Sequence, residues 1–250
     1  MRVRAVLIAV FLFLATFART STAQSTWIDH ARVSVNLGGA TPSSSTFSAT
    51  QTVPVNEQTA TLTSTYGVPS GAFFDGAVTL KVSGGFGIDV GASIFNRSQT
   101  ASIAGTIPSP VMFGRQRPIT GTSAPLERNE IAGHLDAAYV LSAGRIDLVV
   151  AGGPAFFTVS QDLVENVTYA ESPTTDTVTF TGAVVSKAMA TALGFDAGVD
   201  VGVKLSKNVG IGAIVRYSRA SVTFPLANTA AGAHVDAGGT HAGAGLRFYF

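Results

Sequence analysis

Apolar and polar residues alternate over long stretches of this chain, and this period of two constrains the fold more than any other feature of the sequence. From Phe195 to Leu205 every second residue is apolar, and the residues between them are Asp, Gly and Lys. The stretch from Val209 to Tyr217 continues the alternation after a short polar turn. A helix would repeat every 3.6 residues or so, and a period of two therefore indicates β-strands.

The same pattern recurs along the chain and predicts eight strands. Three tight turns join pairs of strands, at 83–85, 142–144 and 206–208. Single strands at 31–37 and 241–250 flank these hairpins. Long connections rich in Ser, Thr, Pro and Asn are expected at 41–71, 103–125, 163–187 and 225–235. Weak alternation over 47–66 suggests that the first of these loops is a hairpin that prolongs the wall.

The first residues of the chain form a targeting segment. Arg2 and Arg4 precede an apolar run over 5–18, and Ser21-Thr22-Ala23 places small residues where a signal peptidase cleaves. This run is shorter than the roughly 20 residues that a spanning helix needs. We therefore predict a cleaved signal peptide at 1–23 and one mature domain at 24–250. No later apolar run approaches spanning length, so the mature chain is expected to be exported without a membrane helix.

The composition excludes several classes of protein. Lys plus Arg number 16 against 15 Asp plus Glu, so no positive excess predicts nucleic-acid binding. The chain has no Cys, which excludes disulfides and Cys-ligated metal sites. A hydrophobic content of 46% excludes a disordered chain. Charged residues are only 12% of the chain, against roughly 25% in a usual soluble domain, which indicates that part of the exterior faces lipid.

The apolar face of each strand could point inward, as in a secreted β-sandwich, or outward into lipid. The alternating stretches run to 10–13 residues, which favours tilted membrane strands of about 9–11 residues over globular strands of about 5–6. Short turns at one end and long loops at the other are typical of outer-membrane barrels, and Gly-rich polar faces suit a narrow interior. Aromatic girdles are expected at the turn end, from Trp27, Phe86, Tyr139, Phe248 and Phe250, and at the loop end, from Phe95, Phe156, Tyr217 and Phe224.

With this leader, the eight alternating strands and the last strand 243–250, the chain resembles the small OmpA/OmpX-type outer-membrane barrels. The alternating Leu246, Phe248 and Phe250 resemble the C-terminal motif that this family presents to the outer-membrane assembly machinery. The resemblance implies a closed eight-stranded antiparallel up-and-down transmembrane β-barrel in a bacterial outer membrane, with both termini periplasmic. It also implies outer-membrane lipid and lipopolysaccharide as surroundings. Because the chain ends at the barrel, no peptidoglycan-binding domain is expected after it.

The polar faces of the strands carry nearly balanced charges. Sixteen residues are expected to form a charge network in the barrel interior: Arg32, Asp75, Lys81, Asp89, Arg97, Arg128, Glu130, His134, Asp136, Arg145, Asp147, Asp196, Asp200, Lys204, Arg216 and Arg247. Buried charges persist when they are paired and hydrogen-bonded. An eight-stranded barrel is just wide enough for side chains to fill, so a sealed polar core is favoured over an ion path.

Glu130, His134 and Asp136 share one strand face, a composition that suits acid–base or metal chemistry. Four residues along a strand span about 13 Å, however, so Glu130 and His134 cannot share one ligand shell. His134 and Asp136, about 7 Å apart, could touch. No catalytic residue, metal site or cofactor is predicted from this group.

The predicted function is a structural or surface-interaction role through long extracellular loops. The alternatives are a narrow pore for small or apolar solutes and, third, a lipid-modifying outer-membrane enzyme; we predict no enzymatic activity. Arg219 has outward parity just beyond Tyr217 and is a candidate contact for lipopolysaccharide phosphates, with a solvated loop residue as the alternative. The ligand of the loops is not predicted.

Overall fold

The described part of the chain is built from antiparallel β-strands. The computed structural model describes residues 28–172, 174–226 and 229–250. Its strands are β1 (Ala31–Pro42), β2 (Thr46–Val55), β3 (Gln58–Gly67), β4 (Gly71–Ser83), β5 (Phe86–Gln99), β6 (Ala101–Pro108), β7 (Gln116–Thr122), β8 (Leu126–Ala143), β9 (Ile146–Ser172), β10 (Thr177–Lys204), β11 (Val209–Leu226) and β12 (Thr229–Tyr249). The predicted all-β antiparallel fold is confirmed. The predicted signal peptide, 1–23, lies outside the described residues.

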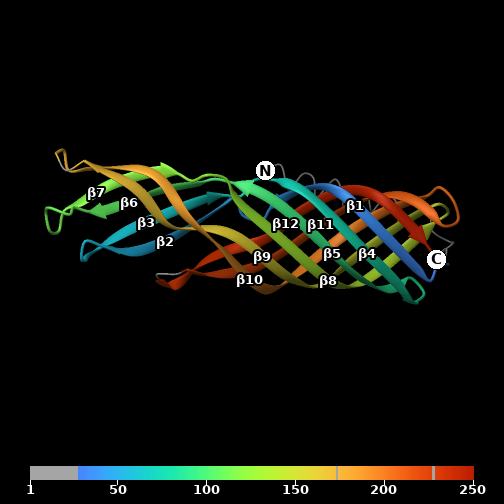
Figure 1. The fold of residues 1–250 in the computed structure, drawn as a ribbon. Coiled ribbons are helices and arrows are strands. Elements are labelled where there is room, and N and C mark those ends of the chain that lie inside the picture. Colours follow the sequence, from blue (N-terminus) through green and yellow to red (C-terminus); the bar gives the residue numbers. More distant parts are fainter. Residues whose placement is uncertain (1–27, 173, 227–228) are drawn as a thin grey trace, which may run out of the picture.

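Eight strands pair into a closed ring in the order β1-β12-β11-β10-β9-β8-β5-β4 (Figure 1). The ring closes because β1 is paired with β12 on one side and with β4 on the other. At this seam Val33 lies opposite both Phe248 and Val78. Every strand of the ring has two partners, so no edge leaves a row of backbone N–H and C=O groups unpaired. Within the described residues, no helix is long and apolar enough to cross a membrane.

Tight turns join β4 to β5, β8 to β9 and β10 to β11 at one end of the ring. Gly84 and Gly144 have φ values of 57° and 62°, and these left-handed turn positions favour glycine. The three predicted hairpins therefore lie where the alternation placed them.

The hairpin suggested over 47–66 is present as β2 and β3, but the other stretches predicted as long loops are also largely strands, which corrects that expectation. Hairpins β2–β3 and β6–β7 pair through β3 and β6 into a second, four-stranded sheet. Strands β9 and β10 stay paired beyond the ring as far as Ser172 and Thr177. Figure 1 shows β2, β3, β6 and β7 at the end opposite the tight turns. We call this end, formed by these four strands and the far halves of β9 to β12, the extension.

The extension has an apolar interior. Phe47 and Tyr66 stack with their ring centroids 4.5 Å apart, and Phe157 and Phe224 are fully buried in the same cluster. The hydroxyl of Tyr66 accepts a hydrogen bond from the backbone N–H of Val164 at 2.9 Å. The outward positions of β3 from Thr59 to Thr65 are threonines. The extension thus has the ordinary arrangement of a protein in water, with apolar side chains inside and polar ones outside.

The ring has the opposite arrangement, and β9 passes through both. In the ring, Ile146 and Phe156 face outward and are 51% and 55% exposed, whereas Asp147 faces inward and is 1% exposed. Further along β9, Phe157 faces inward and Thr158 faces outward. The side chains keep alternating, but the apolar set moves from the outside to the inside of the wall at Phe156.

Strand β11 inverts in the same way. Val215 and Tyr217 face outward in the ring, and the next outward residue is Arg219. On the inner face, Arg216 is followed along the strand by the apolar Val222 and other buried residues. The inversion is therefore shared by strands on different sides of the ring.

The outward apolar side chains of the ring form a continuous belt. They lie within 33–37, 74–82, 86–94, 131–141, 146–156, 193–203, 209–217 and 242–250. In these described ranges no outward residue is charged. On β8 the belt runs from Ile131 to Leu141, about 34 Å of strand, and a tilt near 40° gives a height of roughly 26 Å, close to the ~25 Å of outer-membrane barrels.

Aromatic pairs mark both borders of this belt. Phe86 packs on Tyr139 near the turns at 4.8 Å, and Phe195 lies 6.1 Å from Tyr217 on the other side. Phe95 and Phe224, both expected in the loop-end girdle, point inward instead and are fully buried. That expectation is wrong, because each of these two residues lies on the face of its strand that also carries the inward-pointing charged residues. Trp27 lies outside the described residues.

Candidate functional site

The structure places most of the predicted charge network inside the ring. Thirteen of the sixteen predicted residues have exposed fractions of 7% or less. They are Arg32, Asp75, Asp89, Arg97, Arg128, Glu130, His134, Asp136, Asp147, Asp196, Asp200, Arg216 and Arg247. The alternation therefore identified the inward face of each strand, and the pairing of the strands stacks these residues into layers.

Three predicted members lie at the turn end. Lys81 and Lys204 are half-buried near the ends of their strands. Lys204 contacts the carboxylates of Asp29 and Asp147, the latter at 3.7 Å. Arg145 is exposed in the turn between β8 and β9, so its assignment to the interior is wrong. The alternation no longer sets the direction of a side chain once the chain has left the strand.

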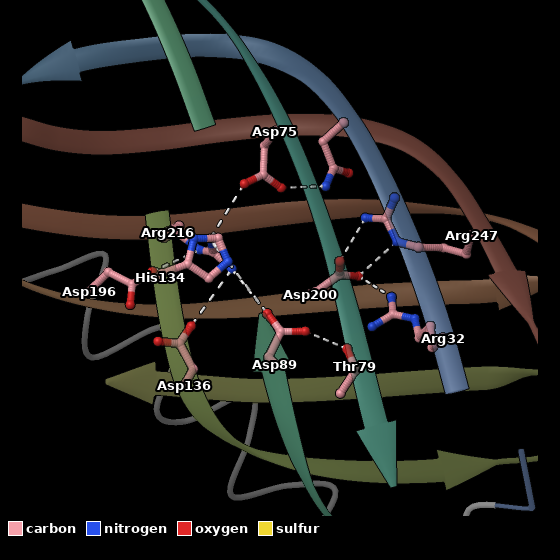
Figure 2. A network of polar contacts seen from close by, with 11 residues as sticks. Arg32, Asp75, Thr79, Asp89, His134, Asp136, Asp196, Asp200, Arg216 and Arg247 are labelled. Atoms are coloured by element: carbon pink, nitrogen blue, oxygen red, sulfur yellow. Dashed lines mark hydrogen bonds and ion pairs between the residues drawn. The ribbon is translucent and has the colours of Figure 1, made fainter. Parts of the chain in front are cut away.

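A turn-side layer is formed by Arg32, Asp200 and Arg247 (Figure 2). Asp200 accepts from both arginines: its Oδ2 lies 2.9 Å from Arg247 Nη2, and its Oδ1 contacts Arg32 and Arg247. One carboxylate between two guanidinium groups leaves this layer with one positive charge in excess.

The middle layer is centred on Arg216 and contains Asp75, Asp89, His134, Asp136 and Asp196 (Figure 2). The guanidinium nitrogens lie 3.4 Å from Asp75, 3.5 Å from Asp89, 3.3 Å from Asp196 and 4.0 Å from Asp136. The same group contacts the imidazole of His134 at 2.7 and 2.8 Å. Four carboxylates thus surround one arginine.

Two of these carboxylates are also fixed by neutral donors. Asn36 Nδ2 donates to Asp75 Oδ1 at 3.0 Å, and Thr79 Oγ1 donates to Asp89 Oδ1. No oxygen of Asp136 or Asp196 has a hydrogen-bond partner among the described residues. The middle layer therefore combines an excess of negative charge with two incompletely satisfied carboxylates.

A loop-side layer contains Arg128, Glu130 and Arg97. Arg128 Nε donates to Glu130 Oε1 at 2.7 Å, and the backbone N–H of Gly238 donates to Glu130 Oε2 at 2.9 Å. The guanidinium of Arg97 lies over the Phe95 ring at 5.5 Å. This layer again has more positive than negative groups, so layers of opposite excess charge alternate along the barrel axis.

Apolar and aromatic side chains also occupy the interior. Phe73 and Phe95 pack around the imidazole of His241, with ring centroids 5.5 and 4.4 Å away. Between the turn-side and middle layers lies a void of about 20 Å³, which has room for about one water molecule. The interior is therefore packed with side chains at several levels.

Inward glycines provide the space for these large side chains. A Cβ at Gly91 would meet the imidazole of His134 and the backbone oxygen of Gly76, and one at Gly212 would meet the Arg247 side chain. The narrow interior accommodates long charged side chains because the residue that faces each of them is a glycine and has no side chain, as expected for a small barrel.

Gly91→Ala should therefore destabilise the folded barrel by about 1–3 kcal/mol, because the Gly76 oxygen is backbone and cannot move away. The fraction of heat-modifiable folded protein on gels, followed through a urea titration, measures the loss. Gly133→Ala is a matched control, since its Cβ would approach only the Gly91 oxygen, at 4.0 Å. Equal stability of the two variants would contradict the close packing of His134 on Gly91.

The predicted C-terminal motif lies at the seam of the ring. Leu246 and Phe250 face outward and are 48% and 64% exposed, and Phe248 lies on the same face opposite Val33 of β1. The backbone oxygen of Phe250 accepts hydrogen bonds from the N–H groups of residues 30 and 31. The motif is therefore part of the outward belt at the point where β1 and β12 close the ring.

The structure places polar atoms of His134 and Asp136 within 4.8 Å of each other and places Glu130 in a different layer. It also adds a neighbour that the sequence analysis did not connect with them: Asp89 of β5 pairs directly with Asp136 of β8. Oxygen or nitrogen atoms of Asp89, His134 and Asp136 lie within 4.8 Å of one another. The alternation of each hairpin was visible in the sequence, but the register between the two hairpins was not.

No family model and no curated protein matches the chain. Among solved structures it is similar to the outer membrane protein OprG from Pseudomonas aeruginosa, at 12% identity and a TM-score of 0.47 over 88% of this chain and 95% of that one. It is also similar to Neisserial surface protein A, at 12% identity and a TM-score of 0.44 over 88% of this chain and 97% of that one. A third similar structure is the outer membrane protease OmpT from Escherichia coli, at 10% identity and a TM-score of 0.44 over 92% of this chain and 100% of that one.

These neighbours are small outer-membrane β-barrel proteins, the class that the sequence resembles. At such low identities and TM-scores, the likeness does not assign a function.

Proposed function

We propose that this protein is an outer-membrane β-barrel that anchors the extension outside the cell, where the extension makes surface contacts. The observation that carries this proposal is the inversion along β9 and β11, from apolar-out in the ring to apolar-in beyond it. An uncharged apolar belt is stable in lipid, and the Thr-rich exterior of the extension is stable in water. The tight turns and both termini would then face the periplasm.

Cysteine labelling in intact cells tests this placement, because the chain has no Cys of its own. Thr61→Cys lies on the outside of the extension and Lys207→Cys in the exposed β10–β11 turn. A membrane-impermeant maleimide should label position 61 in intact cells, and position 207 only after the outer membrane is permeabilised. Labelling of both positions in intact cells, or the reverse order, would refute the proposed orientation.

The filled interior supports an anchor rather than a narrow pore. Charged layers and the His241 cluster occupy the ring, and the void of about 20 Å³ between two of these layers has room for about one water molecule. The buried His134–Asp136 group is enclosed by the wall, so it does not support a lipid-modifying activity. Planar bilayers containing the protein are expected to show no stable single-channel openings.

The tip of the β6–β7 hairpin is the part of the extension best suited to such contacts. Val111, Met112 and Phe113 are 65%, 47% and 89% exposed. Their backbone is ordered, because Ser109 Oγ accepts hydrogen bonds from the N–H groups of Val111 and Met112 and Gln58 accepts one from Gly114. An ordered loop that holds apolar side chains in water is typical of an interaction site.

Replacing Val111 and Phe113 together with serine should lower the adhesion of intact cells to a hydrocarbon phase several-fold, because these side chains form the apolar tip. The measurement is the fraction of cells that partition into hexadecane, at equal amounts of folded protein in the outer-membrane fraction, read from the heat-modifiable gel band. The control variant Thr61→Ser changes the side wall of the extension and leaves the tip intact. Unchanged partitioning of the double variant would show that the tip does not provide the apolar surface contact.

Arg219 is proposed to contact lipopolysaccharide phosphates at the outer border of the belt. It is the first outward residue after Tyr217, and its guanidinium forms an ion pair with Asp236 at 2.9 Å. A phosphate would have to compete with this carboxylate. We therefore expect Arg219→Ala to lower lipopolysaccharide retention on the purified barrel by a few-fold and Asp236→Asn to raise it. Changes in the same direction for both variants would argue against a phosphate contact.

A further inference from the structure

Three metal-binding side chains converge inside the middle layer. Asp89 on β5 and Asp136 on β8 are paired across the sheet, and His134 is two residues before Asp136 on the same inward face. Asp89 Oδ2 lies 3.6 Å from His134 Nε2, and one donor atom of each of the three lies within 4.8 Å of the others. Ligands bound at about 2.0–2.2 Å around a tetrahedral ion are themselves roughly 3.3–3.6 Å apart, so the spacing of Asp89 and His134 already suits a shared ion.

A second observation points to a cation at the same place. Asp136 is 2% exposed and Asp196 is 3% exposed, yet none of their four carboxylate oxygens accepts a hydrogen bond from a described residue. Figure 2 shows both carboxylates next to His134 and Arg216, and Asp136 is the carboxylate farthest from the guanidinium, at 4.0 Å. A buried carboxylate without donors is costly, and a bound cation would satisfy it.

The charge of the middle layer leads to the same conclusion. When all four are ionised, Asp75, Asp89, Asp136 and Asp196 supply four negative charges, and Arg216 supplies one positive charge. A metal-bound His134 would be neutral, so a divalent ion would leave one net negative charge between two layers of positive excess. The hydrogen bond from Thr79 to Asp89 Oδ1 orients this carboxylate and leaves Oδ2 directed at His134, as an outer-shell partner does in metal sites.

We propose that the middle layer binds one divalent first-row transition-metal ion, with Asp89, His134 and Asp136 as ligands and Asp196 as the nearest further carboxylate. One imidazole with two or three carboxylates suits Zn²⁺, Mn²⁺ or Co²⁺ better than a soft ion. The ion would cross-link β5 to β8 inside the wall. Because the filled ring blocks access, it would be bound as the barrel folds, when metal binding and folding are coupled.

The test is to refold the full chain in detergent with Zn²⁺ or with EDTA and to measure metal per chain by mass spectrometry after gel filtration. We expect close to one Zn²⁺ per folded chain, and a visible absorption band of bound Co²⁺ when Co²⁺ replaces Zn²⁺. Asp136→Asn should lose both signals. Asp75→Asn should keep them, because Asp75 already pairs with Asn36 and lies outside the ligand group.

The heat-modifiable gel band shows that each variant is folded. EDTA during refolding should lower the thermal midpoint of the wild type and leave that of Asp136→Asn unchanged. The proposal is overturned if the folded wild type carries no more metal than Asp136→Asn, or if Asp75→Asn loses as much as Asp136→Asn. If Asp136→Asn does not fold, the metal content and the Co²⁺ spectrum of the wild type still decide whether the middle layer binds metal. A folded wild type with neither signal would overturn the proposal and would indicate that protons neutralise this layer.

Discussion

Replacing Val199 with arginine should destabilise the barrel in a bilayer by about 2–4 kcal/mol, the cost of a cationic side chain on the lipid face near the midplane. Val199 lies in the middle of the β10 part of the belt and is 40% exposed. Its register neighbours Val150 and Val215 are also exposed and apolar, so an arginine there has no partner on the outer wall. Urea unfolding in phospholipid vesicles, read from the heat-modifiable band, gives the loss.

Thr179→Arg provides the matched control on the same strand. Thr179 is exposed on the outer face of the extension, where an arginine would meet water and change stability by no more than about 0.5 kcal/mol. A large loss for Val199→Arg together with no loss for Thr179→Arg would show that the two halves of β10 contact different solvents. Equal effects would contradict a lipid-facing belt.

Removing the guanidinium of Arg216 should have the largest effect among the interior residues. Arg216→Met leaves the four carboxylates of the middle layer without their shared ion-pair partner. Breaking a buried pair from one side costs about 3–5 kcal/mol, because the remaining charge is uncompensated. The same urea titration measures this loss.

Arg247→Met is the comparison for this prediction. Arg247 is also fully buried, but its partner Asp200 keeps the ion pair with Arg32. We therefore expect a smaller loss than for Arg216→Met. Equal losses in the two variants would argue that the volume of the arginine side chain, and not the charge of the layer, decides stability.

Much of the ring was predictable because strand alternation is a local property. The stretch 195–205 shows its two faces without any tertiary information, and its inward Asp196 and Asp200 are buried as predicted. Arg145 was misplaced because the inward parity of Asp147 on β9 was extended back into the turn that precedes this strand. Phe95 and Phe224 were misplaced because aromatic residues near strand ends were taken as girdle residues, although their parity placed them inside.

The extension and the metal ligands were harder to predict for different reasons. The Ser and Thr of 46–65 resemble loop composition, but Thr is a strong β-former, and the alternation with Phe47 and Val53 was the weak signal of β2. The inversion could have been found in β9, where apolar residues change parity between Phe156 and Phe157. The pairing of Asp89 with Asp136 could not have been found, because it depends on which hairpins are neighbours and on their register.

Spin labelling along β11 tests the central claim most directly. Single cysteines at 211 and 215 in the belt and at 221 and 223 in the extension all face outward on one strand. In a bilayer, the first two labels should collide with oxygen dissolved in lipid and be shielded from a water-soluble nickel complex, and the last two should show the opposite. If all four outward labels contact the nickel complex equally, the apolar belt is not in lipid and the account of the barrel is wrong.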